Sequence, residues 1–237
     1  MPLLAYRSCA RSDVGKRRAE NQDRVLDRPE ARLWAVADGM GGHAEGGRAA
    51  ALVVGALAGV DHGASGYACL AEIERRVAAV NDRLFAEGRE GGRSGSTLVA
   101  LLAHEGHVAC LWAGDSRAYL LRDRALSRLT RDHSVVQELI DGGAIPEAAR
   151  RDHPHANIVT RAIGGSAALA LERRFLPVGP GDRLLLCSDG LTLCLGDAEL
   201  AAALSAGALA DAADALLAQA LARGAPDNVS LVAVEVC

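Results

Sequence analysis

The chain has 237 residues, half of them hydrophobic, and is long enough to bury a substantial core as one large domain or two small ones. Its formal net charge of −4 argues against a nucleic-acid-binding surface, and its aromatic content of 3% argues against base stacking. The six cysteines are scattered without a C-x-x-C pair, and no apolar segment approaches the roughly 20 residues of a membrane span. We therefore expect a cytoplasmic protein with reduced thiols, and no nucleic acid or membrane as partner.

The first third of the chain predicts strands, a polar loop and two helices. Residues 3–9 are expected to form a strand, and a polar loop with a cationic cluster follows over 12–23. The apolar run 33–37 is too short for a helix and leads into a glycine-rich turn, which indicates a buried strand. Residues 45–60 and 67–87 are predicted helices, the second of them clearly amphipathic.

The middle of the chain predicts antiparallel strands, because apolar runs over 94–102, 107–115 and 116–121 follow one another with tight turns. Residues 129–166 are polar and offer no strong core face, so we interpret them as an inserted flap. Short helices are expected within it at 135–141 and 146–151. The remaining strands and a helical stretch broken near Gly207 are expected over residues 169–176, 183–187, 198–223 and 229–234.

Four aspartates stand at the ends of predicted strands. Two of them are followed by glycine, and the four are Asp38, Asp115, Asp189 and Asp227. If these ends converge, about four negative charges would share one place, which like-charge repulsion opposes unless cations offset it. Oxygen ligands without paired Cys or His predict a hard cation, Mg²⁺ or Mn²⁺.

Other motifs receive less support. The segment from Gly39 to Ala44 matches a relaxed dinucleotide fingerprint, with Asp61 about 20 residues further on. However, Asp38 would place a negative charge beside the pyrophosphate, and the parallel βαβ rhythm is missing. No Gly-Lys-Ser/Thr follows the turn, and no serine lies in a G-x-S-x-G elbow.

Histidines and arginines leave two alternatives open. The pairs His104/His107 and His153/His155 have no third ligand at zinc-site spacing, so surface positions are favoured over a zinc site. His43 shares the turn with Asp38 and is either a capping residue or a proton donor. The cationic cluster at 16–18 is either a solvated loop or a guanidinium aimed at a phosphate.

Seven motifs together resemble those of the PPM/PP2C-type metal-dependent protein Ser/Thr phosphatases in their bacterial form. They are R-A-E-N-Q-D at 18–23, D-G-M-G-G-H at 38–43, S-G-S-T at 94–97, A-G-D-S-R at 113–117, D-H-S at 132–134, S-D-G-L at 188–191 and D-N-V at 227–229. The resemblance implies an α+β fold over a single domain, residues 1–237: a four-layer αββα sandwich of two antiparallel sheets flanked by helices, with the flap at about 129–166.

The resemblance also implies a set of metal ligands. Asp38 would bridge two core ions, Mn²⁺ or Mg²⁺, and the Gly39 carbonyl would ligate the second. Asp189 and Asp227 would hold the first ion, and Asp115 together with Asp189 would form a third, weaker site.

The same resemblance implies a reaction. Asp23 and Gln22 would act through metal-bound waters, and Arg18 would bind the substrate phosphate. A hydroxide bridging the two ions would attack phosphoserine or phosphothreonine directly. The general acid stays open between His43 and a water at the Asp115 site. We expect a monomer whose partners are phosphoproteins, including a bacterial Ser/Thr kinase that it opposes and that kinase's substrates; a binding module with little turnover is the alternative.

Overall fold

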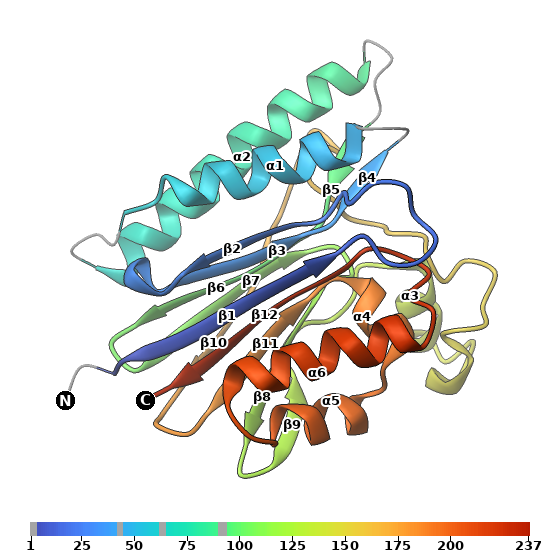
Figure 1. Cartoon of the computed structure of the whole chain (residues 1–237). Helices are drawn as coiled ribbons and strands as arrows, with labels where there is room; N and C mark the ends of the chain where they lie inside the picture. The colour runs from blue at the N-terminus through green and yellow to red at the C-terminus, as the bar shows by residue number, and fades with distance from the viewer. Residues whose placement is uncertain (1–3, 42–44, 62–64, 90–93) are drawn as a thin grey trace.

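Two five-stranded antiparallel sheets are stacked face to face and covered by helices on both outer faces (Figure 1). This computed structural model describes residues 4–41, 45–61, 65–89 and 94–237. The strands of the first sheet are, in spatial order, β1 (Tyr6–Asp13), β12 (Val229–Val236), β11 (Arg183–Cys187), β8 (Arg117–Arg122) and β9 (Ala125–Arg128). Those of the second are β10 (Glu172–Pro177), β7 (His107–Ala113), β6 (Leu98–His104), β3 (Leu33–Ala37) and β2 (Arg24–Arg28).

The helices form the two outer layers. The second sheet is covered by α1 (Glu45–Ala58) and α2 (Gly66–Arg89). The first sheet is covered by α4 (Asp189–Cys194), α5 (Asp197–Leu204) and α6 (Leu209–Ala222). The four-layer αββα sandwich is therefore confirmed.

Alternation along the strands explains the layers. In β3, Trp34 and Val36 pack toward the first sheet, while Leu33, Ala35 and Ala37 pack toward the covering helices. Because both faces of this strand are buried, it reads as an unbroken apolar run rather than an alternating one. The inner layer between the sheets also receives Leu101 and Leu186, from β6 and β11.

Several elements differ from the predictions. The first strand lies at Tyr6–Asp13 rather than at 3–9, and β2 and β9 were not predicted. Both are edge strands, and β2 buries only Leu26, so their sequences look like loops. The predicted strand over 94–102 is interrupted at Thr97, and its first part, β5 (Ser94–Ser96), pairs instead with β4 (Gly39–Gly41).

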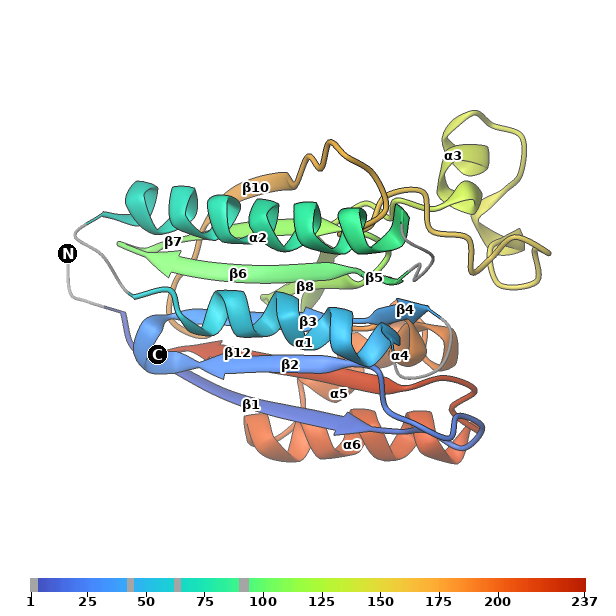
Figure 2. The same ribbon diagram turned by 90° about the horizontal axis from the view of Figure 1, so that it is seen from above.

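The flap region extends away from the layers, as the part of the chain around α3 (Val135–Asp141) shows in Figure 2. The second short helix expected there is a 3₁₀ turn, η2 (Glu147–Ala149); a similar turn, η1 (Pro29–Ala31), follows β2. One isolated bridge, Ser96 with Ile163, joins the returning segment of the flap to the body, and a second, Ser134 with Val159, joins the two ends of the flap to each other. The flap is thus fastened next to the end of β5.

Both described chain ends lie at the same end of the first sheet, because β1 and β12 pair antiparallel over their full lengths (Figure 1). Tyr6 lies opposite Val236, and the Cys237 N–H donates to the Ala5 carbonyl at 2.9 Å. The opposite ends of these strands, at Asp13 and Val229, are where the loops of the site begin.

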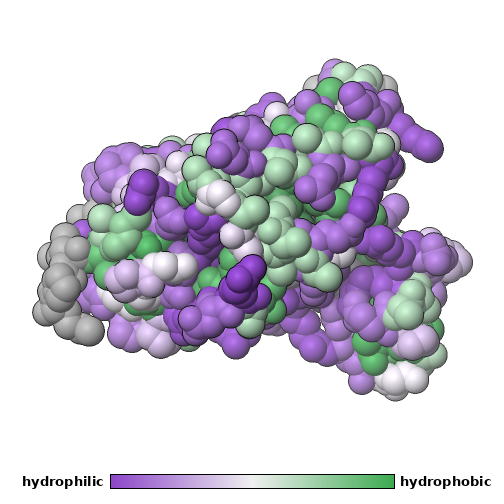
Figure 3. Space-filling model, turned by 60° about the horizontal axis from the view of Figure 1, so that its bottom comes forward, coloured by the Kyte–Doolittle hydropathy of each residue, from purple (hydrophilic) through white to green (hydrophobic). Residues whose placement is uncertain are grey.

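The face that carries α5 and α6 is largely hydrophilic, with hydrophobic residues scattered through its middle (Figure 3). Exposed alanines of these helices, such as Ala202, Ala210 and Ala218, contribute apolar surface of small side chains. In the described part of the chain, none of the helices combines the length and the apolar character that crossing a membrane would require.

Candidate active site

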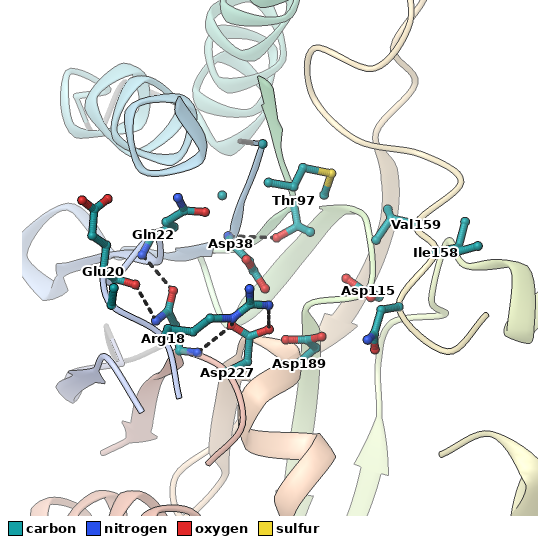
Figure 4. A pocket seen from close by; sticks show the side chains of 16 residues that line it. Arg18, Glu20, Gln22, Asp38, Thr97, Asp115, Ile158, Val159, Asp189 and Asp227 are labelled. Carbon is teal, nitrogen blue, oxygen red and sulfur yellow. Dashed lines mark hydrogen bonds and ion pairs between the residues drawn. The ribbon is translucent and has the colours of Figure 1, made fainter. Parts of the chain in front are cut away.

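A cavity of about 720 Å³ lies where loops from both sheets meet (Figure 4). Seven residues of the predicted site line it: Arg18, Gln22, Asp38, Gly39, Asp115, Asp189 and Asp227. Figure 4 shows the carboxyl groups of Asp38, Asp189 and Asp227 around a common space. Asp115 lies on the side of the flap residues Ile158 and Val159. The predicted convergence of the four aspartates is thus observed, while His43 lies outside the described residues.

Asp38 is positioned by its backbone. Its N–H donates to Thr97 Oγ1 at 3.0 Å, and the Thr97 N–H donates back to the Asp38 carbonyl at 2.8 Å. Thr97 Oγ1 in turn lies 2.7 Å from Ser116 Oγ, next to Asp115. These bonds hold the strand end while leaving the carboxylate directed at the cavity. The role of Thr97 was not predicted, since it depends on a contact between residues 59 positions apart.

The glycines that follow two of the aspartates permit close backbone contacts. A Cβ added at Gly39 would lie 2.0 Å from the Gly46 carbonyl oxygen, at the start of α1. A Cβ added at Gly190 would lie 2.0 Å from the carbonyl oxygen of Asn228. The second contact brings the Asp189 turn against the turn that carries Asp227. Each Asp-Gly pair therefore combines a ligand candidate with a contact that only glycine allows.

Asn228 fastens the loop that carries Arg18. Its side-chain amide donates to the carbonyls of Val14 and Glu20, at 2.9 and 3.0 Å. Its Oδ1 accepts from the Gln22 N–H at 2.8 Å. One buried amide thus satisfies three backbone groups of a polar loop and holds that loop at the rim of the cavity.

Asp23 lies behind the cavity and is 2% exposed. The Ser188 hydroxyl donates to its Oδ2 at 2.7 Å, and Ser188 also exchanges two hydrogen bonds with Ser230. Burial raises the pKa of Asp23 to about 6, although the Ser188 hydrogen bond opposes this rise. Asp23 is thus a buried acid held by Ser188, and its water-mediated role at a bound ion stays a prediction.

The acids around the cavity repel one another. Burial and then the neighbouring carboxylates raise the pKa of Asp38 and of Asp189 well above the usual range. Burial and then Asp132 raise the pKa of Asp115 to about 6. Two buried oxygens, Oδ1 of Asp23 and Oδ1 of Asp189, have no hydrogen-bond partner among the described residues.

Unpartnered carboxylate oxygens in a buried acidic cluster fit a hard divalent cation, which would offset both the repulsion and the lost solvation. Within the described residues, however, no three His, Cys, Asp or Glu side chains are grouped closely enough to hold an ion by themselves. Backbone carbonyls, such as that of Gly39, and water would have to complete the coordination.

Arg18 forms a bidentate pair with Asp227, at 2.8 Å from Nε to Oδ1 and 2.6 Å from Nη2 to Oδ2. Its side chain is 58% exposed at the mouth of the cavity. The guanidinium is therefore beside the site, as predicted, but it contacts one of the predicted metal ligands. An exposed pair of this kind contributes little stability, about 0–1 kcal/mol, so a competing anion can replace Asp227 readily.

A second buried acid, Asp132, organises the flap side and was not predicted to do so. Arg117 donates to both of its oxygens, and Arg128 and the flap residue Arg150 donate to it as well. Next to it, the His133 ring accepts at Nδ1 from the Gly114 N–H at 3.0 Å, which holds the turn before Asp115. The D-H-S motif at 132–134 drew attention to these residues, but the motif alone did not predict the contacts of Asp132 and His133.

The fold and the site together define a protein with an acidic cavity where loops of two stacked antiparallel sheets meet. The sequence profile described as protein phosphatase 2C matches residues 15–227, most of the chain. The chain belongs to the protein phosphatase 2C family, and the predicted resemblance is confirmed.

Known relatives cover the chain almost completely. It is 40% identical over 239 residues to the serine/threonine protein phosphatase PstP of Mycobacterium tuberculosis, covering 98% of this chain and 45% of PstP. The chain thus spans about half the length of that curated relative. A solved structure of Pseudomonas aeruginosa PppA, titled a key regulatory component of T6SS, has a TM-score of 0.91 and 43% identity, over 98% of each chain. The PstP catalytic domain in complex with two manganese ions has a TM-score of 0.88 and 39% identity, over 99% of each chain.

Proposed function

We propose that this chain is a metal-dependent protein Ser/Thr phosphatase that removes phosphate from phosphoserine and phosphothreonine. The observation that carries the proposal is the convergence of Asp38, Asp189 and Asp227 on one cavity, with a buried Asp189 oxygen that has no hydrogen-bond partner in the described part of the chain. In a member of this family, that acidic cluster is best explained as a site for divalent cations.

Asp38 would contribute to both core ions. Asp189 and Asp227 would hold the first ion, and the Gly39 carbonyl would ligate the second. Asp115 would contribute to a third ion, and Asp23 would act through water. Mn²⁺ and Mg²⁺ both suit this donor set, and the two manganese ions of the PstP domain support Mn²⁺. When bound, such ions make water a nucleophile near neutral pH and polarise the phosphoryl oxygens.

The chain itself positions the substrate. Arg18 would leave Asp227 and present two N–H groups to two phosphoryl oxygens, a geometry that guanidinium groups favour. The hydrogen bonds of Thr97 and Asn228 keep Asp38 and the Arg18 loop in place during this exchange. Two groups are candidates for returning a proton to the leaving alkoxide: the His43 side chain, and a water held by Asp115.

The partners that we propose are phosphoproteins, including a Ser/Thr kinase and that kinase's substrates, and we propose that the chain acts on them as a monomer. The support is that relatives whose alignment covers nearly all of this chain are named serine/threonine protein phosphatases. Size-exclusion chromatography with light scattering tests the monomer, and a dimer mass would contradict it.

Hydrolysis of p-nitrophenyl phosphate and of a phosphothreonine peptide, with Mn²⁺, with Mg²⁺ and with EDTA, tests the activity. We expect turnover that requires metal and falls at least about a thousandfold in Asp38→Asn. Asp214→Asn is the matched control, since Asp214 pairs with Arg11 on the surface of α6. A folded wild-type protein without turnover in either metal would contradict the proposal and favour a binding module.

A further inference from the structure

A second hollow adjoins the catalytic cavity. It has a volume of about 650 Å³, and its lining includes Met40, Phe85, Gly88, Arg89, Ser94 and Ala162. Met40 and Gly41 line both hollows, so the two adjoin along β4. A molecule whose phosphate lies in the catalytic cavity can therefore extend into this second hollow, which we call the β4 groove.

The floor of the β4 groove is built from backbone rather than from long side chains. Gly95 of β5 pairs with Met40, and Ser96 exchanges two backbone hydrogen bonds with Ile163, at 3.0 and 2.9 Å. Gly164 has a φ of +88°, and a Cβ there would lie 2.7 Å from Leu84 Cβ. The groove is thus a fixed feature of the fold, formed where β5, the returning segment of the flap and α2 meet.

One polar atom in this lining lacks a partner. Ser94 is 7% exposed, and its Oγ has no hydrogen bond among the described residues. A buried hydroxyl without a partner is unusual, because most buried polar side-chain atoms are hydrogen-bonded. The amide or carbonyl group of a bound polypeptide would satisfy it, while Phe85 and Met40 offer an apolar contact beside it.

We propose, on the basis of the proposed function, that the β4 groove binds the substrate polypeptide next to its phosphorylated residue and selects an apolar side chain there. The adjacency to the catalytic cavity identifies the occupant, since the phosphorylated residue itself would anchor the polypeptide. The lining of Phe85, Met40, Ala162 and glycines favours an aliphatic side chain, and the positive charge of Arg89 in the same lining disfavours a cationic one. The Ser94 hydroxyl would hold the adjacent backbone.

Gly88 offers a direct test. It lies in α2 and lines the groove, and a Cβ added to it would meet no atom of the described residues within 4 Å. Gly55 of α1 has the same open surroundings but lies on the exposed surface, away from both hollows. Gly88→Leu and Gly55→Leu therefore make the same change in a helix, and both should favour helix formation, but only the first fills the groove.

The substrates are p-nitrophenyl phosphate, which carries no polypeptide to occupy the groove, and phosphothreonine peptides with Leu or Lys at the adjacent positions. We expect wild type to prefer the Leu peptide at least fivefold on one side of the phosphothreonine. Gly88→Leu should lower kcat/KM for that peptide about tenfold and leave p-nitrophenyl phosphate within twofold. Gly55→Leu should leave kcat/KM unchanged for both substrates. Ser94→Ala should lower kcat/KM about threefold for the Leu peptide alone.

A Gly88→Leu protein that melts like wild type and hydrolyses the Leu peptide equally well would overturn the proposal. Equal losses with both kinds of substrate would do so too, because they would indicate damage to the catalytic cavity. Failure of the proposed function is distinguishable, since wild type would then hydrolyse neither substrate. In that case fluorescence anisotropy of a labelled Leu phosphopeptide decides: weaker binding to Gly88→Leu than to Gly55→Leu supports the groove, and equal binding refutes it.

Discussion

Arg18 has two possible partners, Asp227 in this structure and a phosphate in the proposed reaction. Because it would bind the phosphate in the ground state and in the transition state alike, Arg18→Ala should raise KM for p-nitrophenyl phosphate about tenfold or more and change kcat only a few-fold. Steady-state kinetics in Mn²⁺ measures both constants, with Arg11→Ala as a surface control. A large loss of kcat at unchanged KM would show that Arg18 acts mainly in the transition state.

Asp23 and Asp115 predict an unusual pH dependence of stability without metal. Their pKa values in the folded protein, about 6, exceed the ordinary value of 3.8, so the folded state binds more protons between these limits. Stability from these groups is fully present below about pH 4 and is lost as the pH rises through about 6. In EDTA we expect Tm to fall by at least about 3 °C between pH 5 and 7.5, the effect of about 1 kcal/mol in a protein of this size.

The comparison with Asp115→Asn isolates this effect, since the variant should lose part of the fall. The pKa values of the surface acids Glu72, Glu87 and Glu199 are lowered to about 2 by their arginine partners, so these acids stay ionised throughout that range. An identical pH profile for wild type and Asp115→Asn would contradict the assignment.

At the scale of elements, the contact between the α4 turn and the start of β12 determines the spacing of Asp189 and Asp227. Gly190→Ala would place a Cβ 2.0 Å from the Asn228 carbonyl oxygen, so one turn must move. We expect a loss of about 2 kcal/mol or more in the free energy of unfolding and at least a tenfold loss of phosphatase activity. A Cβ at Gly55 would lie in open space, so Gly55→Ala should raise the free energy of unfolding by about 0.5–1 kcal/mol, because alanine favours a helix over glycine. Urea unfolding of both variants measures the difference, and equal stabilities would exclude the predicted clash.

Elements differed in how far the sequence could predict them. Asp38, Asp115 and Asp189 were predictable because each adjoins a long apolar strand, and that local pattern places an acid at a strand end. The edge strands β2 and β9 were not predicted because they bury few residues. The helix α4 was not predicted because it has only six residues, too few to show a distinctive helical spacing of apolar side chains. The roles of Thr97, Asp132 and Asn228 depend on contacts across the fold, which no local pattern contains.

On the scale of the whole molecule, the candidate cation site joins the two sheets. Asp38 extends from β3 of the second sheet, whereas Asp189 and Asp227 adjoin β11 and β12 of the first. Ions bound by both sets would stabilise the sandwich as a unit, by RT ln(1 + [L]/Kd), about 2.7 kcal/mol at a hundredfold excess over Kd.

We therefore expect saturating Mn²⁺ to raise Tm by at least about 5 °C at pH 7.5, in a protein where about 1 kcal/mol corresponds to 2–4 °C. Asp189→Asn should abolish most of this rise, and Asp214→Asn should retain it. Differential scanning calorimetry measures the shift directly. A full Mn²⁺ effect in Asp189→Asn would place the stabilising ion elsewhere.

The pairing of β1 with β12 has a topological consequence. Because Ala5 and Cys237 are hydrogen-bonded to each other, a short linker could join the two ends of this 237-residue chain into a closed ring without disturbing the sheet. New ends could then be opened at the exposed loop around Gly207, between α5 and α6, to give a circular permutant. A tag or fused protein attached at either end of this chain would begin one strand length from the cavity, about 26 Å for eight residues, and so would not block it.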